Sequence, residues 1–118
     1  MEKNGKKQVD IIMQKILSKV KASAKKKILY LPHAIRQMSR PDRMISPNDV
    51  REVIQNGEII ENYPEDPRGH SCLMLYQKID NRPIHIVCAP KEDYLAIITA
   101  YIPTPDEWDA KYKKRKKI

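Results

Sequence analysis

Apolar and polar residues recur with a helical period near the start of the chain. In residues 8–27 the apolar side chains follow spacings of three and four: Val9, Ile12, Met13, Ile16, Leu17 and Val20. Lysines occupy the opposite arc: Lys15, Lys19, Lys21, Lys25 and Lys26. This spacing predicts a basic amphipathic helix, interrupted only by Ile11. Two interpretations stay open: a helix that covers the core and leaves its lysines in solvent, or one whose lysines contact phosphates or a membrane surface.

Two shorter helices are predicted before residue 57. Pro32 suits the first turn of a helix that continues through His33 and is ended by Pro41. The next helix begins at Ser46-Pro47-Asn48-Asp49, which combines an N-cap, a proline at the first helical position and an acid at the third. Gly57 ends this helix, and we expect it in the left-handed conformation.

After Gly57 the period changes to two, which predicts strands. They cover Glu58–Tyr63, Cys72–Ile79, Pro83–Ala89 and Tyr94–Ile102. Short turns, one of them at Asp80-Asn81, favour an antiparallel meander. A second N-cap at Thr104 predicts a short C-terminal helix with Trp108 and Tyr112 one turn apart. The expected fold is therefore α+β: N-terminal helices, a four-stranded antiparallel sheet and a short C-terminal helix.

Charge divides the chain into three parts. Residues 1–28 carry a net charge of +7, residues 29–110 a net charge of −5, and residues 111–118 six Lys or Arg without an acid. We therefore predict a basic helical extension, an α+β domain and a basic tail. The basic ends are typical of nucleic-acid binding. No apolar run approaches the roughly 18 residues of a membrane span, and no secretory signal is recognisable, so we expect a cytoplasmic protein with no membrane partner.

The two cysteines do not indicate a metal site. Cys72 and Cys88 are sixteen residues apart, without a CxxC or a paired Cys/His spacing. We expect buried free thiols that lie close together if their strands are neighbours. No metal and no cofactor is predicted.

Two histidines are the candidate catalytic residues. Alternation in Ile84–Cys88 places His85 on the face opposite its apolar neighbours. In the last strand Ile97, Thr99 and Tyr101 share a face. We place His85, Thr99 and Tyr101 on the open face of the sheet. His33 is the other candidate. Metal-free RNA cleavage needs a base for the 2′-hydroxyl proton, an acid for the leaving oxygen and a cation beside the phosphate, and histidine suits either proton role.

Cations and one amide are the candidate substrate contacts. Arg36 lies beside His33 on the predicted helix, and Gln37 is one turn from His33. Arg36 or Arg82 can hold a phosphate bidentately, and Tyr101 or Thr99 can donate a hydrogen bond to it, so Arg36, Thr99 and Tyr101 join the two histidines as catalytic candidates. In the tail, Lys113, Lys114 and Arg115 can contact a phosphate backbone. A local structural role for each histidine, and a solvated tail, are the alternatives.

The order of these segments resembles a known family. They are His33-Ala34 with Met38, Arg43 with Ile45-Ser46, Asp49-Val50, Asn56-Gly57-Glu58-Ile59-Ile60-Glu61 with Tyr63-Pro64, Arg82-Pro83-Ile84-His85-Ile86-Val87, and Ile98-Thr99-Ala100-Tyr101 with Pro103 and Trp108. Together they resemble domain-of-unknown-function family 4258 over roughly residues 30–109. The chain departs from the family pattern at Gln37, where the family often has an arginine.

The resemblance implies a function through similarity of this family to RelE-type and MqsR-type toxins. It implies a RelE-like fold, a ribonuclease toxin that acts on RNA, and an antitoxin-like protein as partner. Two other classes stay open: a non-catalytic nucleic-acid binder that uses the basic ends, and a protein-interaction module that uses an exposed sheet edge.

Overall fold

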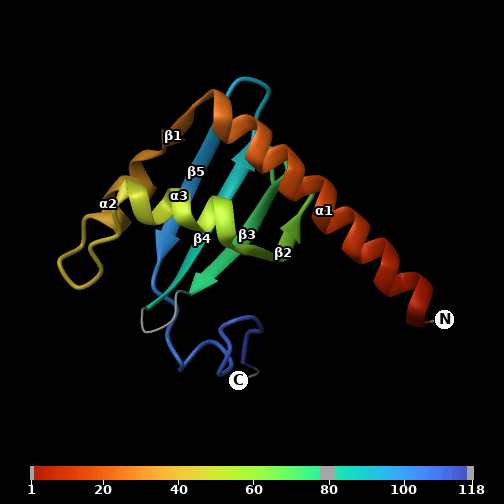
Figure 1. The fold of residues 1–118 in the computed structure, drawn as a ribbon. Helices are drawn as coiled ribbons and strands as arrows, with labels where there is room; N and C mark the ends of the chain where they lie inside the picture. Colours follow the sequence, from red (N-terminus) through yellow and green to blue (C-terminus); the bar gives the residue numbers. More distant parts are fainter. Residues whose placement is uncertain (1, 78–81, 117–118) are drawn as a thin grey trace.

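The computed structural model describes residues 2–77 and 82–116, with side chains from residue 9 onward. In this part of the chain three helices and five strands follow one another (Figure 1). They are α1 (Glu2–Lys26), β1 (Ile28–Tyr30), α2 (Pro32–Met38), α3 (Pro47–Asn56), β2 (Glu58–Tyr63), β3 (Ser71–Gln77), β4 (Pro83–Pro90) and β5 (Leu95–Tyr101). The α+β class is confirmed. The predicted turn at Asp80-Asn81 lies outside the described residues.

The sheet is mixed, which corrects the prediction of four antiparallel strands. Its order is β1-β5-β4-β3-β2, and the antiparallel meander from β2 to β5 is as expected. β1 adds a fifth strand parallel to β5, with Ile28 opposite Leu95 and Tyr30 opposite Ile97. Three residues are too few for a period of two to be recognised, so this strand is set by its partner.

The helices cover one face of the sheet, as Figure 1 shows. Each helix contributes to one apolar core with the strands: Ile16 and Val20 from α1, Ala34 and Met38 from α2, and Val50, Val53 and Ile54 from α3. The apolar stripe of α1 is only partly used, because Val9 and Ile12 near its start stay about half exposed. No helix among the described residues combines the length and apolar character that crossing a membrane requires.

α3 begins as predicted and ends differently. Ser46 accepts a hydrogen bond from the Asp49 backbone N–H at 3.1 Å, and the Asp49 carboxylate accepts one from the Ser46 backbone at 2.9 Å. Gly57 has an extended backbone (φ −80°, ψ 177°), so the left-handed prediction is wrong. Glycine is required there for space, because a Cβ atom would lie 2.5 Å from the Val53 carbonyl oxygen and 2.7 Å from that of Leu75.

The predicted C-terminal helix is not formed in the described residues. Its first turn begins at Thr104, whose carbonyl accepts hydrogen bonds from the N–H groups of Glu107 and Trp108. The Asp109 carboxylate then accepts the backbone N–H groups of Lys111 and Lys113 at 3.1 and 3.0 Å. These bonds compete with a helical ladder and turn the chain back, so that Trp108 pairs with Arg115 in an antiparallel bridge.

Candidate functional site

His85 lies on the sheet face opposite the helices, as the alternation in β4 predicts. Its neighbours Ile84 and Ile86 belong to the core under the helices. On β5, Tyr101 stands opposite His85 and shares its face. The prediction for Ile97 is wrong, because a register shift after Val87 moves Ile97 into the core on the helix side.

Thr99 is the third residue predicted for this face. It is half-buried and stands opposite Val87, the next residue after His85 on the same face of β4. The register therefore places Thr99 on the same face as His85, one pair further along the strands. The hydrogen bonds of His85 are formed with Tyr101 and Tyr112 and not with Thr99.

His85 is completely buried, with both ring nitrogens hydrogen-bonded. Nε2 lies 2.8 Å from the Tyr112 carbonyl oxygen and Nδ1 lies 3.1 Å from the Tyr101 hydroxyl. A carbonyl can only accept, so Nε2 carries the proton and Nδ1 accepts from Tyr101. Burial lowers the pKa of His85, although the bond to Tyr112 opposes the shift. The neutral imidazole is therefore the stable form.

The C-terminal segment covers His85. Trp108, itself only 1% exposed, packs edge-to-face on the imidazole with ring centroids 4.4 Å apart. The Arg115 guanidinium lies 4.7 Å from the centroid of Trp108 and donates two hydrogen bonds of 3.1 Å to the carboxylate of Glu61 on β2. The sheet face that was expected to be open at His85 is therefore closed in this structure.

The Glu61 carboxylate also binds Tyr63. The Tyr63 hydroxyl donates to it, and burial together with this bond raises the pKa of Tyr63 to about 12. Burial raises the pKa of Glu61, but the hydrogen bonds from Arg115 and Tyr63 outweigh it and hold that pKa below its usual range. The site around His85 thus consists of a neutral imidazole and, beside it, the ion pair between Arg115 and Glu61.

The other predicted histidine is on the opposite side of the sheet. His33 and Arg36 are exposed side chains of α2, one turn apart. Ala34 and Met38 of the same helix pack into the core under the helices. The side chain of Gln37 accepts a hydrogen bond from Arg43 at 2.5 Å. The sheet therefore separates His33 from His85, and the structure does not bring the two together.

The predicted phosphate contacts are largely paired with acids. Arg82 donates to the Met44 carbonyl at 2.6 Å and lies 3.5 Å from the Asp49 carboxylate. Lys113 forms an ion pair of 2.8 Å with Glu58 on β2, and this contact raises the pKa of Lys113. The basic tail is thus folded back onto the edge of the sheet.

Arg115 and Lys114 complete the predicted tail. Arg115 is held by Glu61 as described above. Lys114 is exposed, and its backbone carbonyl accepts the Asp109 N–H at 2.9 Å. Two of the three predicted tail cations, Lys113 and Arg115, therefore form ion pairs within the molecule.

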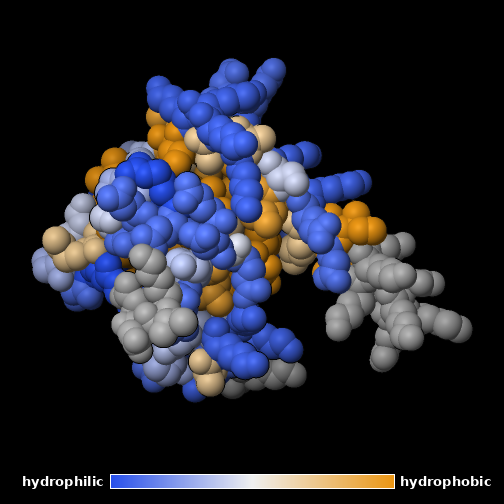
Figure 2. Space-filling model, viewed as in Figure 1, coloured by the Kyte–Doolittle hydropathy of each residue, from blue (hydrophilic) through white to orange (hydrophobic). Residues whose placement is uncertain are grey.

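The lysines of α1 are arranged differently. Lys15, Lys19, Lys21 and Lys25 are exposed, and none of the ion pairs found within residues 9–77 and 82–116 involves them. Figure 2 shows hydrophilic residues projecting from α1, with hydrophobic residues visible between α1 and α3. Lys26 donates to the Glu92 carbonyl at 2.8 Å and fixes the end of the helix to the turn before β5.

No group of three or more His, Cys, Asp or Glu suited to a metal ion occurs within the described part of the chain. Comparison with known proteins gives one match: a family model described as a domain of unknown function (DUF4258) matches residues 30–102. These residues run from the end of β1 to just beyond β5, so α1 lies outside the match. Neither the curated proteins nor the solved structures contain a significant match.

Proposed function

The chain belongs to the DUF4258 family, and we propose that it is a cytoplasmic RNA-binding protein that contacts the RNA backbone through α1. One observation carries the proposal: α1 is anchored by buried Ile16 and Val20, while the lysines around this stripe stay exposed and without carboxylate partners among the described residues. A row of cations fixed on a rigid helix is suited to a phosphate backbone.

The charge of the rest of the chain supports this assignment. Residues 29–110 are acidic overall, and the tail cations Lys113 and Arg115 are paired with Glu58 and Glu61. Among the described residues, α1 therefore carries a group of exposed lysines that is available for a polyanion. Burial of His85 beneath Trp108 also favours binding over a reaction at that histidine.

The test is RNA binding as a function of salt. Fluorescence anisotropy with a labelled single-stranded RNA would compare the full chain with a K15Q/K19Q double variant. We expect weaker binding by the variant and a log–log salt slope smaller by about 1.4, because each neutralised phosphate of a single strand contributes roughly 0.7 to the slope. Lys113→Gln is the matched control, since this lysine is paired with Glu58, and it should leave the slope unchanged. An unchanged slope in K15Q/K19Q would refute the role of α1.

A second function is favoured by a separate observation, the exposure of His33 and Arg36 side by side on α2. It is the metal-free ribonuclease of a RelE-like toxin, which would work with an antitoxin-like partner. In it, His33 takes the proton of the 2′-hydroxyl as this oxygen attacks the phosphorus, Arg36 holds the phosphate, and the leaving 5′-oxygen takes a proton from water. Cellular RNA incubated in EDTA with wild-type protein should be cleaved, and His33→Ala should slow the cleavage by about 10². Equal cleavage by His33→Ala, or no cleavage by the wild type, would count against this function and leave binding alone.

A further inference from the structure

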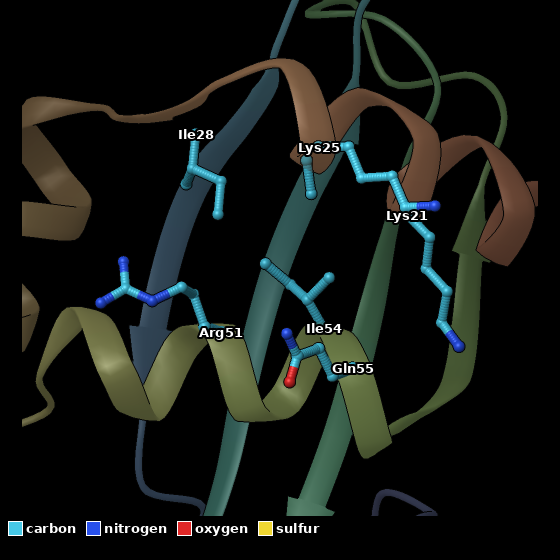
Figure 3. Close-up of a pocket in the computed structure, with 7 residues that line it drawn as sticks. Lys21, Lys25, Ile28, Arg51, Ile54 and Gln55 are labelled. Carbon is cyan, nitrogen blue, oxygen red and sulfur yellow. The ribbon is translucent and has the colours of Figure 1, made fainter.

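A cleft of about 260 Å³ lies between α1, β1 and α3, on the side of the sheet covered by helices. Figure 3 shows its composition. Ile28 of β1 and Ile54 of α3 form an apolar base, while Lys21 and Lys25 border the cleft from α1 and Arg51 borders it from α3. Cations from two helices thus surround an apolar surface.

We propose that this cleft binds a nucleoside monophosphate, either as a free nucleotide or as the terminal nucleotide of an RNA. The proposal rests on the RNA binding proposed above and assigns it a specific end-binding site. The flat apolar face of a base is matched by Ile28 and Ile54, and the amide of Gln55 offers both a donor and an acceptor to a base edge. The cations at the rim are matched to the phosphate.

Arg51 is the central phosphate contact. Its guanidinium donates to the side chain of Asn48, which orients it, and an arginine has five N–H donors in a fork that matches a phosphate bidentately. In Figure 3 the Arg51 guanidinium lies at one end of the cleft, and the side chains of Lys21 and Lys25 extend toward the other end. A phosphate beside Arg51 would therefore be held by Arg51, while the two lysines add positive charge along the α1 side of the cleft.

The size of the cleft suits a single base. Its volume of about 260 Å³ lies just below the roughly 300 Å³ at which sites for drug-sized ligands begin. One base fits within it, with the ribose and the phosphate at the rim. A base paired in a duplex is stacked on both faces and cannot enter.

The first experiment is a titration of the ¹⁵N-labelled full chain with AMP, GMP, CMP and UMP, followed by NMR, with inorganic phosphate and an unphosphorylated nucleoside as comparisons. We expect shifts in the backbone amides of Lys25, Ile28, Arg51 and Gln55, and an affinity about tenfold lower in Arg51→Gln. Lys111→Gln removes the same charge from the exposed C-terminal segment, away from the cleft, and should bind nucleotide like the wild type. Equal binding of inorganic phosphate and nucleotide, or of wild type and Arg51→Gln, would overturn the proposal.

The second experiment separates the two sources of the ligand and the two proposals. A single-stranded RNA with a 5′-phosphate is compared with its 5′-hydroxyl counterpart. If the 5′-phosphorylated RNA binds more tightly and free nucleotide competes with it, the RNA end is the ligand. If both RNAs bind equally while nucleotide still shifts the cleft amides, the ligand is the free nucleotide. RNA binding without nucleotide shifts overturns the cleft proposal alone, and nucleotide shifts without RNA binding overturn the proposed function.

Discussion

Acid should destabilise this protein through one buried histidine. His85 is completely buried, accepts from Tyr101 and donates to the Tyr112 carbonyl, and its pKa is lowered below 6.5. A proton added to Nδ1 would place a charge in the interior and replace the acceptor that Tyr101 uses. The charged group facing this site from β2 is Glu61, whose carboxylate is already paired with Arg115.

The sign of the effect follows from the direction of the pKa shift. Below pH 6.5 the unfolded chain binds a proton at His85 that the native protein does not. The contribution of His85 to the free energy of unfolding is therefore fully present above that pH and is lost as the pH falls. Between pH 7 and 5.5 the loss has an upper limit of about 1.3 kcal/mol, which applies if His85 stays neutral in the native protein over this whole range. For a chain of 118 residues this upper limit corresponds to a decrease in Tm of about 5 °C.

The measurement is urea unfolding of wild type, His85→Gln and His33→Gln at pH 7, 6 and 5.5. Glutamine retains a donor near Nε2, so His85→Gln should fold with lower stability but with a flatter pH dependence. His33→Gln removes an exposed histidine and should keep the slope of the wild type. Equal slopes in wild type and His85→Gln would refute the reasoning. This range lies above the region in which carboxylates such as Glu61 titrate.

Three further predictions concern the scaffold. Gly57→Ala should lower the free energy of unfolding by about 2–3 kcal/mol in urea titrations, because its Cβ would strike the Val53 carbonyl; an unchanged midpoint would contradict this. Ser46→Ala should cost about 1 kcal/mol through loss of the capping box, and Ser46→Asp should recover most of it. Cys72 and Cys88 are buried with their sulfur atoms 3.9 Å apart, and this contact together with burial raises the pKa of Cys88. Both thiols should therefore react with a thiol reagent only after unfolding. Rapid labelling of the folded protein would contradict this prediction.

Local signals predicted the elements whose residues carry their own pattern. The capping box at Ser46 and the strand Glu58–Tyr63 are as expected, because a cap and a period of two are properties of consecutive residues. β1 was not predicted, since its three residues acquire strand geometry only from β5. The helix predicted after Thr104 is wrong: only one turn forms there, because burial of Trp108 and the side chain of Asp109 redirect the chain.

The candidate site could be predicted only in part for similar reasons. Alternation placed His85 and Tyr101 on one face, and the register confirms that they are opposite each other. Alternation cannot reveal the register shift in β5 or the folding back of the tail, so the covering of His85 by Trp108 was not expected. Arg51 carries no signal by itself. Its significance arises because α3 is packed beside α1, which is a property of the tertiary fold.

The parallel pairing of β1 with β5 also determines when this protein can fold. Ile28 and Leu95 are neighbours in the sheet although they are far apart in the chain, and the segment that covers His85 follows still later. On a ribosome, the N-terminal helix therefore emerges long before the strand that completes its sheet. Until β5 has been released, the lysines of α1 belong to a chain whose sheet is incomplete, so the surface that we propose for RNA binding should form only after Tyr101 has left the ribosome.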